Sequence, residues 1–185
     1  MVGEAVGEYR GETSADDESE MRIELPVDAH LPTDYVESER LRLEMYRRLA
    51  EVRSDDDVDG VRAELVDRYG TPPAPTEALL QVARFRIACR RAGLTEVMTQ
   101  GNFIRFGPVN GRLLASGERV DLAESRQLRL QRLHPGTLLK DATNVALVPR
   151  PMTQTIPIAP VDGLPLLEWA TWVVEAVFAP TEARP

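Results

Sequence analysis

Residues 76–107 read TEALLQVARFRIACRRAGLTEVMTQGNFIRFG, and the spacing of the apolar side chains changes part-way along this stretch. In its first half these side chains recur every three or four positions and spread widely around the axis, which predicts an α-helix with two covered faces. Gly93 ends that helix. Residues 94–100 and 103–107 then follow the pattern of a β-hairpin that turns at Gly101-Asn102. A buried helix followed directly by a hairpin predicts an α+β fold.

Two further helices and a short strand are predicted upstream. Residues 21–25 alternate between polar and apolar like a strand, which stops at a proline. Ser38, Ser54 and Thr76 are the predicted N-caps of three successive helices. Gly70 and the two prolines that follow it end the second helix. The predicted inward positions of the first two helices are Leu41, Met45, Leu49, Val52, Val58, Val61, Leu65 and Tyr69, with Tyr46 beside the first four.

Downstream of residue 107, hairpins are predicted to alternate with single helices. In chain order the elements are a small hairpin around Ser116-Gly117 or a loop within 108–121, a helix over 122–133, a hairpin of 137–140 and 145–149 around Thr143-Asn144, a proline-containing loop over 150–163, and a helix over 164–178. In the helix over 122–133, Leu128 and Leu133 are predicted to point inward. The predicted fold therefore consists of three N-terminal helices followed by β-hairpins that alternate with helices.

Acidic residues are concentrated at the N-terminus. The 185-residue chain carries a formal charge of −8, and its first 20 residues hold seven acidic side chains and one basic side chain. The other 165 residues are nearly neutral, with 23 acidic and 21 basic side chains. We interpret 1–20 as the tail of a preceding module and an acidic linker, 21–150 as one domain, and 151–185 as a Pro-rich loop and a C-terminal helix.

The composition argues against several classes of protein. One cysteine, Cys89, excludes an internal disulfide framework, and two histidines with one cysteine argue against a structural zinc site. The only lysine, Lys140, lies in Leu-Leu-Lys-Asp, so the chain has no phosphate-binding P-loop. No stretch resembles a membrane span or a signal peptide. We expect a cytoplasmic chain that binds no metal, cofactor or membrane.

A catalytic centre is not indicated. His30 and His134 lie in no recognisable catalytic motif. Arg86, Arg90 and Arg91 lie close to Cys89 in sequence and could lower the pKa of its thiol. The apolar surroundings instead favour a buried, unreactive cysteine. A small enzyme would need a cleft around His134 or Cys89.

The end of the second predicted helix breaks a local electrostatic rule. Glu64 and Asp67 are three residues apart, and both lie near the negative end of the helix dipole. Arg68, four residues after Glu64, offsets part of this cost. Asp67 has no basic residue three or four positions before it. A rule broken without local compensation often marks a functional site. We therefore predict that Glu64 and Asp67 meet a cation from elsewhere, on this domain or on a partner, and matter little for folding.

A second candidate surface is basic. Arg126, Arg129 and Arg132 are spaced to share one outward face of the helix over 122–133. Such a face could contact nucleic acid or RNA polymerase. The near-neutral charge of the chain beyond residue 20 and the lack of interleaved aromatic residues favour a solvated arginine face instead.

Several runs resemble the C-terminal domain of the bacterial transcription-repair coupling factor, Mfd. They are Leu25-Pro26 through Asp34-Tyr35, Arg40-Leu41-Arg42-Leu43, Tyr46 to Ala50, Glu64-Leu65-Val66-Asp67-Arg68-Tyr69-Gly70 with Pro72-Pro73, and Ala83-Arg84-Phe85-Arg86 before Gly93-Leu94. The resemblance is strong over 21–107 and extends over roughly 1–150. Met1 to Val6 resembles the end of the family's RecG-like translocase module.

The resemblance implies a regulatory role. The family's full-length protein is an ATP-driven DNA translocase that displaces stalled RNA polymerase and recruits UvrA, and its translocase module alone holds ATP and magnesium. The C-terminal domain has no catalytic chemistry. It docks on the N-terminal UvrA-binding domain and masks it. Acidic residues that match Glu64 and Asp67, beside Arg68, make that contact in the family.

Overall fold

The structure is a computed structural model that describes residues 21–107, 112–113, 119–120, 123–140, 143–154 and 157–178. Its helices are α2 (Glu39–Glu51), α3 (Asp55–Tyr69), α4 (Ala74–Arg91), α5 (Glu124–Leu133) and α6 (Gly163–Val173), which continues as a π-helical turn (Val174–Phe178). Its strands are β1 (Arg22–Glu24), β2 (Glu96–Gln100), β3 (Phe103–Phe106), β4 (Arg112–Leu113), β5 (Arg119–Val120), β6 (Leu138–Lys140) and β7 (Val145–Pro149). The predicted α+β class is confirmed, and the predicted N-terminal tail over 1–20 lies outside the described residues.

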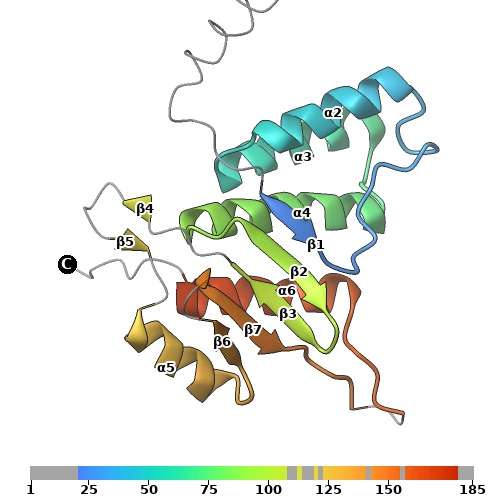
Figure 1. Cartoon of the computed structure of the whole chain (residues 1–185). Helices are drawn as coiled ribbons and strands as arrows, with labels where there is room; N and C mark the ends of the chain where they lie inside the picture. The colour runs from blue at the N-terminus through green and yellow to red at the C-terminus, as the bar shows by residue number, and fades with distance from the viewer. Residues whose placement is uncertain are drawn as a thin grey trace, which may run out of the picture.

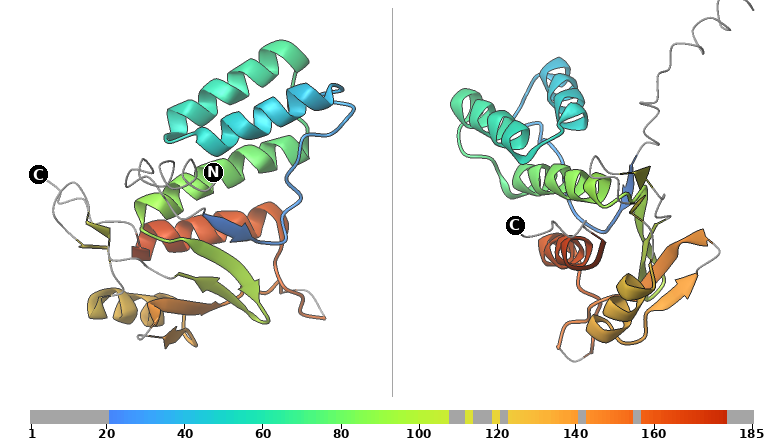
Figure 2. Two further views of the ribbon diagram at one scale, coloured as in Figure 1. Left: turned by 45° about the horizontal axis from the view of Figure 1, so that its top comes forward. Right: turned by 90° about the vertical axis from the view of Figure 1, so that its left-hand side faces the viewer.

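One five-stranded sheet organises the molecule. Its strand order is β1-β2-β3-β7-β6, with β1 parallel to β2 and every other neighbouring pair antiparallel. Helices α4 and α6 lie on one side of this sheet, and the α2–α3 pair packs on the far side of α4 (Figures 1 and 2). The α2–α3 pair therefore forms an outer layer beyond α4.

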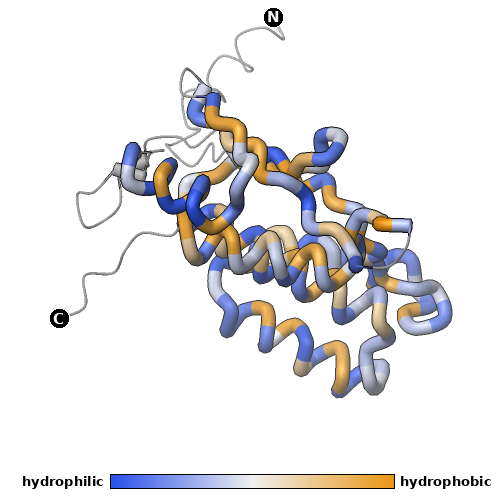
Figure 3. The backbone as a smooth tube through the Cα atoms, turned by 90° about the horizontal axis from the view of Figure 1, so that it is seen from below, coloured by the Kyte–Doolittle hydropathy of each residue, from blue (hydrophilic) through white to orange (hydrophobic). Residues whose placement is uncertain are grey.

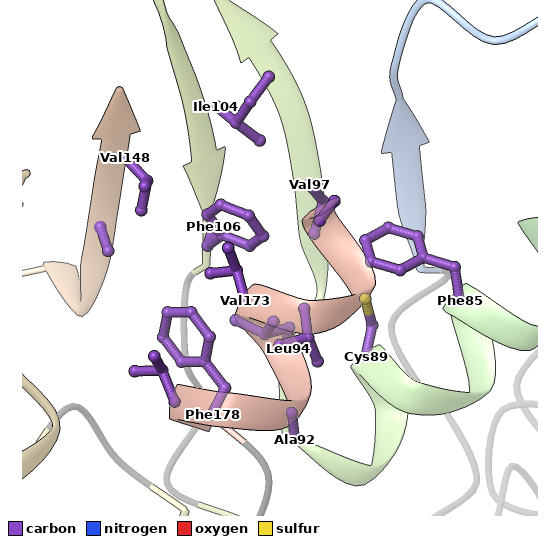
Figure 4. Close-up of a cluster of buried hydrophobic side chains, with 14 of the residues drawn as sticks. Phe85, Cys89, Ala92, Leu94, Val97, Ile104, Phe106, Val148, Val173 and Phe178 are labelled. Atoms are coloured by element: carbon purple, nitrogen blue, oxygen red, sulfur yellow. The ribbon is translucent and has the colours of Figure 1, made fainter. Parts of the chain in front are cut away.

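Helix α4 separates two hydrophobic cores, as its broad apolar pattern predicted. Phe85 and Cys89 face the core formed by the sheet and α6, where Figure 4 shows them beside Val97. Leu80, Ala83 and Ile87 face a second core shared with α2 and α3. Along the helices hydrophobic and hydrophilic residues alternate in short segments, as expected when each helix has a covered and an open side (Figure 3).

The predicted start of α2 and both predicted ends of α3 are confirmed. The Ser38 hydroxyl accepts a hydrogen bond from the Leu41 N–H (3.4 Å), and Ser54 forms a reciprocal capping box with Asp57. At the other end of α3, Gly70 adopts φ +82° and its N–H donates to the Val66 carbonyl (2.9 Å). Positive φ costs glycine little, so this residue lets the chain turn away from the helix.

The predicted start of α4 is wrong. The helix begins at Ala74 with Pro73 as N-cap, and Thr76 lies inside its first turn. Pro75 fits there because the first-turn N–H groups have no partner within the helix, so the missing N–H of proline costs nothing. The Thr76 side chain is buried, and its hydroxyl donates to the His30 carbonyl (3.3 Å).

The inward face of α5 also differs from the prediction. Leu130 is fully buried, whereas Leu128 and Leu133 are 60% and 40% exposed. The side chains that face the protein recur every four residues, from Arg126 through Leu130 to His134. This register is set by the contact of α5 with the π-helical turn after α6.

The predicted hairpins are found. Gly101 (φ +59°) turns the β2–β3 hairpin, and Asn144 (φ +51°) lies at the turn of the β6–β7 hairpin. The segment 108–121 contains a small hairpin rather than only a loop, because β4 and β5 pair antiparallel. Its expected turn, Ser116-Gly117, lies outside the described residues.

Candidate interdomain contact site

The candidate acidic residues lie on the last two turns of α3. Val58, Val61 and Leu65 are buried against α2 and α4, and they fix the rotation of the helix about its axis. With that face covered, Glu64 and Asp67 point away from the core. The Glu64 side chain is 26% exposed, and Asp67 is exposed.

Glu64 already has counter-charges within this fold. The Arg48 guanidinium on α2 donates to Oε2 of Glu64, and Arg68 Nη1 lies 3.5 Å from Oε1. The cation from outside the helix that was predicted for Glu64 is therefore Arg48, which lies on this domain and not on a partner. The sequence places Arg68 on the same helix, but only the packing of α2 against α3 brings Arg48 to this carboxylate.

Asp67 remains available to a partner. Among the residues that the structure describes, no hydrogen bond or ion pair involves its carboxylate. It lies in the last turn of a 15-residue helix, where the free carbonyl groups make a negative charge unfavourable. A cation brought by another surface would relieve this cost, so Asp67 is the acidic residue that fits an interdomain contact.

A tyrosine from the loop before α2 holds this end of α3. The Tyr35 hydroxyl lies 2.9 Å from the Gly70 carbonyl oxygen and 3.2 Å from that of Leu65. The ring packs edge-on against Tyr69, with ring centres 5.7 Å apart. Burial, followed by the nearby Glu77 carboxylate, raises the pKa of Tyr35, so its hydroxyl stays protonated and can donate. Sequence reasoning missed this contact, because 30 residues separate Tyr35 from Leu65.

The three arginines of α5 do not share one free face, contrary to the prediction. Arg126 points inward, and its Nη1 donates to the Phe178 carbonyl (2.8 Å). Arg129 and Arg132 are exposed. The inward register set by Leu130 explains this difference, since Arg126 lies one turn before that leucine on the same face. A basic surface on α5 therefore has two exposed arginines.

The candidate nucleophile and bases lie in three different parts of the fold. Cys89 is fully buried, and burial raises the pKa of its thiol far more than Arg86 lowers it. His134 packs against Trp169 and Trp172, with ring centres 5.7 and 5.3 Å away, and burial lowers its pKa. His30 pairs at the surface with Asp28 (2.8 Å).

The described residues contain neither a candidate metal site nor a helix that could cross a membrane. No group of three His, Cys, Asp or Glu side chains in the described part of the chain is arranged to hold a metal ion. No helix within the same ranges has the length and apolar character needed to cross a membrane.

Comparisons with known proteins agree with the resemblance. Residues 25–112 match the family model of the TRCF domain. The transcription-repair-coupling factors of Mycobacterium tuberculosis and Mycobacterium bovis are each 42% identical over 162 residues, which is 82% of this chain and 12% of theirs. That of Staphylococcus haemolyticus is 33% identical over 105 residues, or 56% of this chain and 9% of its own.

A solved structure shares the fold. The crystal structure of a C-terminal domain of transcription-repair coupling factor has a TM-score of 0.59 and 16% sequence identity, covering 88% of this chain and 98% of that one. Fold and sequence together thus define an α+β domain of the TRCF class. The chain belongs to the transcription-repair coupling factor family, as its C-terminal domain. It spans about 12% of the length of the mycobacterial relatives.

The Arg48–Glu64 pair should contribute to folding, whereas Asp67 should not. Both members of the pair are partly exposed, so we expect a coupling free energy of roughly 0.2–1 kcal/mol. A double-mutant cycle of Glu64→Gln and Arg48→Met, followed by urea unfolding of the chain, measures it. Asp67→Asn is the matched control and should not lower the free energy of unfolding, because the helix dipole disfavours the carboxylate that it removes. A loss for Asp67→Asn as large as that for Glu64→Gln would show that Asp67 has a structural partner.

Proposed function

We propose that this domain is an autoinhibitory latch of a transcription-repair coupling factor. In this role it docks on the N-terminal UvrA-binding domain of the same protein and masks the surface that UvrA recognises. The observation that supports the proposal is the exposed carboxylate of Asp67 at the negative end of α3, which has no ion pair or hydrogen bond among the residues that the structure describes. An arginine on the docking domain would neutralise it.

The expected strength of such a contact suits a latch. Two domains of one chain meet at an effective concentration that the segments between them determine, so a weak contact can keep them together. A close interfacial charge pair couples by about 1.5–7 kcal/mol. To change a latch from almost always closed to almost always open, a ligand must bind the open state more tightly than the closed state by about 5.5 kcal/mol. Since Arg48 and Arg68 already neutralise Glu64, the main charge of the contact is that of Asp67, and the latch stays reversible.

The rest of the proposal concerns the whole protein. We infer that the parent is an ATP-driven DNA translocase that displaces stalled RNA polymerase and recruits UvrA. ATP and magnesium would bind to its translocase module. This domain would contribute no catalytic group, and its contact with UvrA, RNA polymerase and DNA would be indirect, through the state of the latch.

Removal of the domain tests the masking. A full-length coupling factor that ends in this domain should retain less UvrA in a pull-down than the same protein without residues 21–178. We expect at least a several-fold difference, because a closed latch competes directly with UvrA. Unchanged ATP hydrolysis on DNA would show that the shortened protein is folded. Equal retention of UvrA by both proteins would contradict the proposal.

A further inference from the structure

We propose that Tyr35 is a positioning residue for Asp67, an inference that rests on the latch function above. The Tyr35 hydroxyl donates its single proton to the Gly70 carbonyl oxygen (2.9 Å) and shares it with the more distant carbonyl oxygen of Leu65 (3.2 Å). These two residues lie on either side of Asp67 in the sequence. One side chain from outside the helix therefore fixes the backbone both before and after the contact residue.

The last turn of α3 needs such a restraint. Helix ends fray, and the carbonyl groups of the last turn have no partner within the helix. A carboxylate at this end adds repulsion from the helix dipole, and Asp67 has no counter-ion among the described residues. Gly70, at φ +82°, gives the following backbone little stiffness. Without Tyr35 the Asp67 carboxylate would sample several positions, and each docking event would have to order it again.

Tyr35 is itself held firmly. The N–H groups of Tyr35 and Val36 donate to the Pro32 carbonyl (3.1 and 3.0 Å), and the Val36 side chain is fully buried. Arg42 of α2 donates to the carbonyl groups of Val36 (2.6 Å) and Glu37 (2.9 Å). The turn that carries Tyr35 is thus tied to the start of α2 and to the core beneath it. Through its hydroxyl, Tyr35 therefore holds the end of α3 against this ordered turn.

The test is Tyr35→Phe in the full-length coupling factor. Phenylalanine keeps the ring that packs on Tyr69 but lacks the hydroxyl. One net hydrogen bond corresponds to about a 2- to 12-fold change in an equilibrium constant, so we expect the closed-to-open ratio to fall by that factor and UvrA retention to rise. Tyr46→Phe is the matched control. Its hydroxyl accepts a hydrogen bond from the Leu31 N–H (2.8 Å) in the same loop, and UvrA retention should stay at the wild-type value.

A combination with Asp67→Asn separates this inference from the latch itself. If Tyr35 acts through Asp67, the double variant should retain no more UvrA than Asp67→Asn alone. Full additivity would overturn the positioning role, as would a wild-type result for Tyr35→Phe when Asp67→Asn opens the latch. No effect of Asp67→Asn would instead refute the proposed function.

Hydrogen exchange gives a readout that a general loss of stability would not produce. In the isolated chain, Tyr35→Phe should speed exchange of the Gly70 amide, whose N–H bonds to Val66, and leave the amides of β2 and β3 unchanged. Faster exchange throughout the chain would show that the hydroxyl supports the whole fold and would overturn the specific role.

Discussion

Asp67→Lys in a full-length coupling factor should increase the amount of UvrA that the protein retains, and by more than any other single substitution on α3. The substitution removes the exposed carboxylate and places a cation opposite the positive surface that we infer on the docking domain. Breaking a close interfacial charge pair costs at least about 2 kcal/mol, so the closed-to-open ratio should fall by roughly 30-fold or more. A UvrA pull-down at physiological salt measures the change.

The matched control is Glu51→Lys. Glu51 is also exposed and ends a helix, α2, but it lies at the opposite end of the α2–α3 pair. Both lysines suit a helix C-terminus, so neither variant should lose thermal stability. Wild-type UvrA retention by Asp67→Lys, or equal increases for the two lysines, would mean that the end of α3 is not the contact.

Phe106→Ala should have the largest effect on stability. Phe106 is fully buried on β3, where it lies beside Phe178 (Figure 4). The centre of its ring is 5.6 Å from that of Phe178 and 6.3 Å from that of Trp169. It joins the central strand to the C-terminal helix. Truncation of a buried phenylalanine costs about 3–5 kcal/mol, and urea unfolding of the isolated chain measures this loss.

Phe103→Ala on the same strand is the comparison. Phe103 is only partly buried, so the same truncation should cost clearly less. Similar losses for the two variants would contradict the placement of Phe106 at the junction of the sheet with the C-terminal helix.

Local signals allowed much of the fold to be predicted. The Ser38 and Ser54 caps and the Gly70 turn act within a few residues, so the sequence shows them directly. The two covered faces of α4 followed from the number of apolar positions. The inward face of α5 could not be predicted in the same way. Leucines lie on several of its sides, and the choice of Leu130 depends on a segment about 45 residues further along the chain.

The features of the candidate site likewise separate into those set by local sequence and those set by tertiary packing. The unfavourable position of Asp67 is a property of one helix and was visible in the sequence. The neutralisation of Glu64 required Arg48 from another helix, and the restraint of Gly70 required Tyr35 from a loop. Tertiary packing determines which counter-ions and hydrogen-bond donors reach a helix from other elements. Residue spacing within that helix does not reveal them.

Titration of the isolated chain with the N-terminal UvrA-binding domain of the same protein, followed by isothermal calorimetry, tests the central role of Asp67 most directly. We expect wild-type binding that weakens as salt rises, and an Asp67→Asn variant with a Kd at least about tenfold higher. An Asp67→Asn variant that binds as tightly as the wild type, with the same salt dependence, would contradict this account.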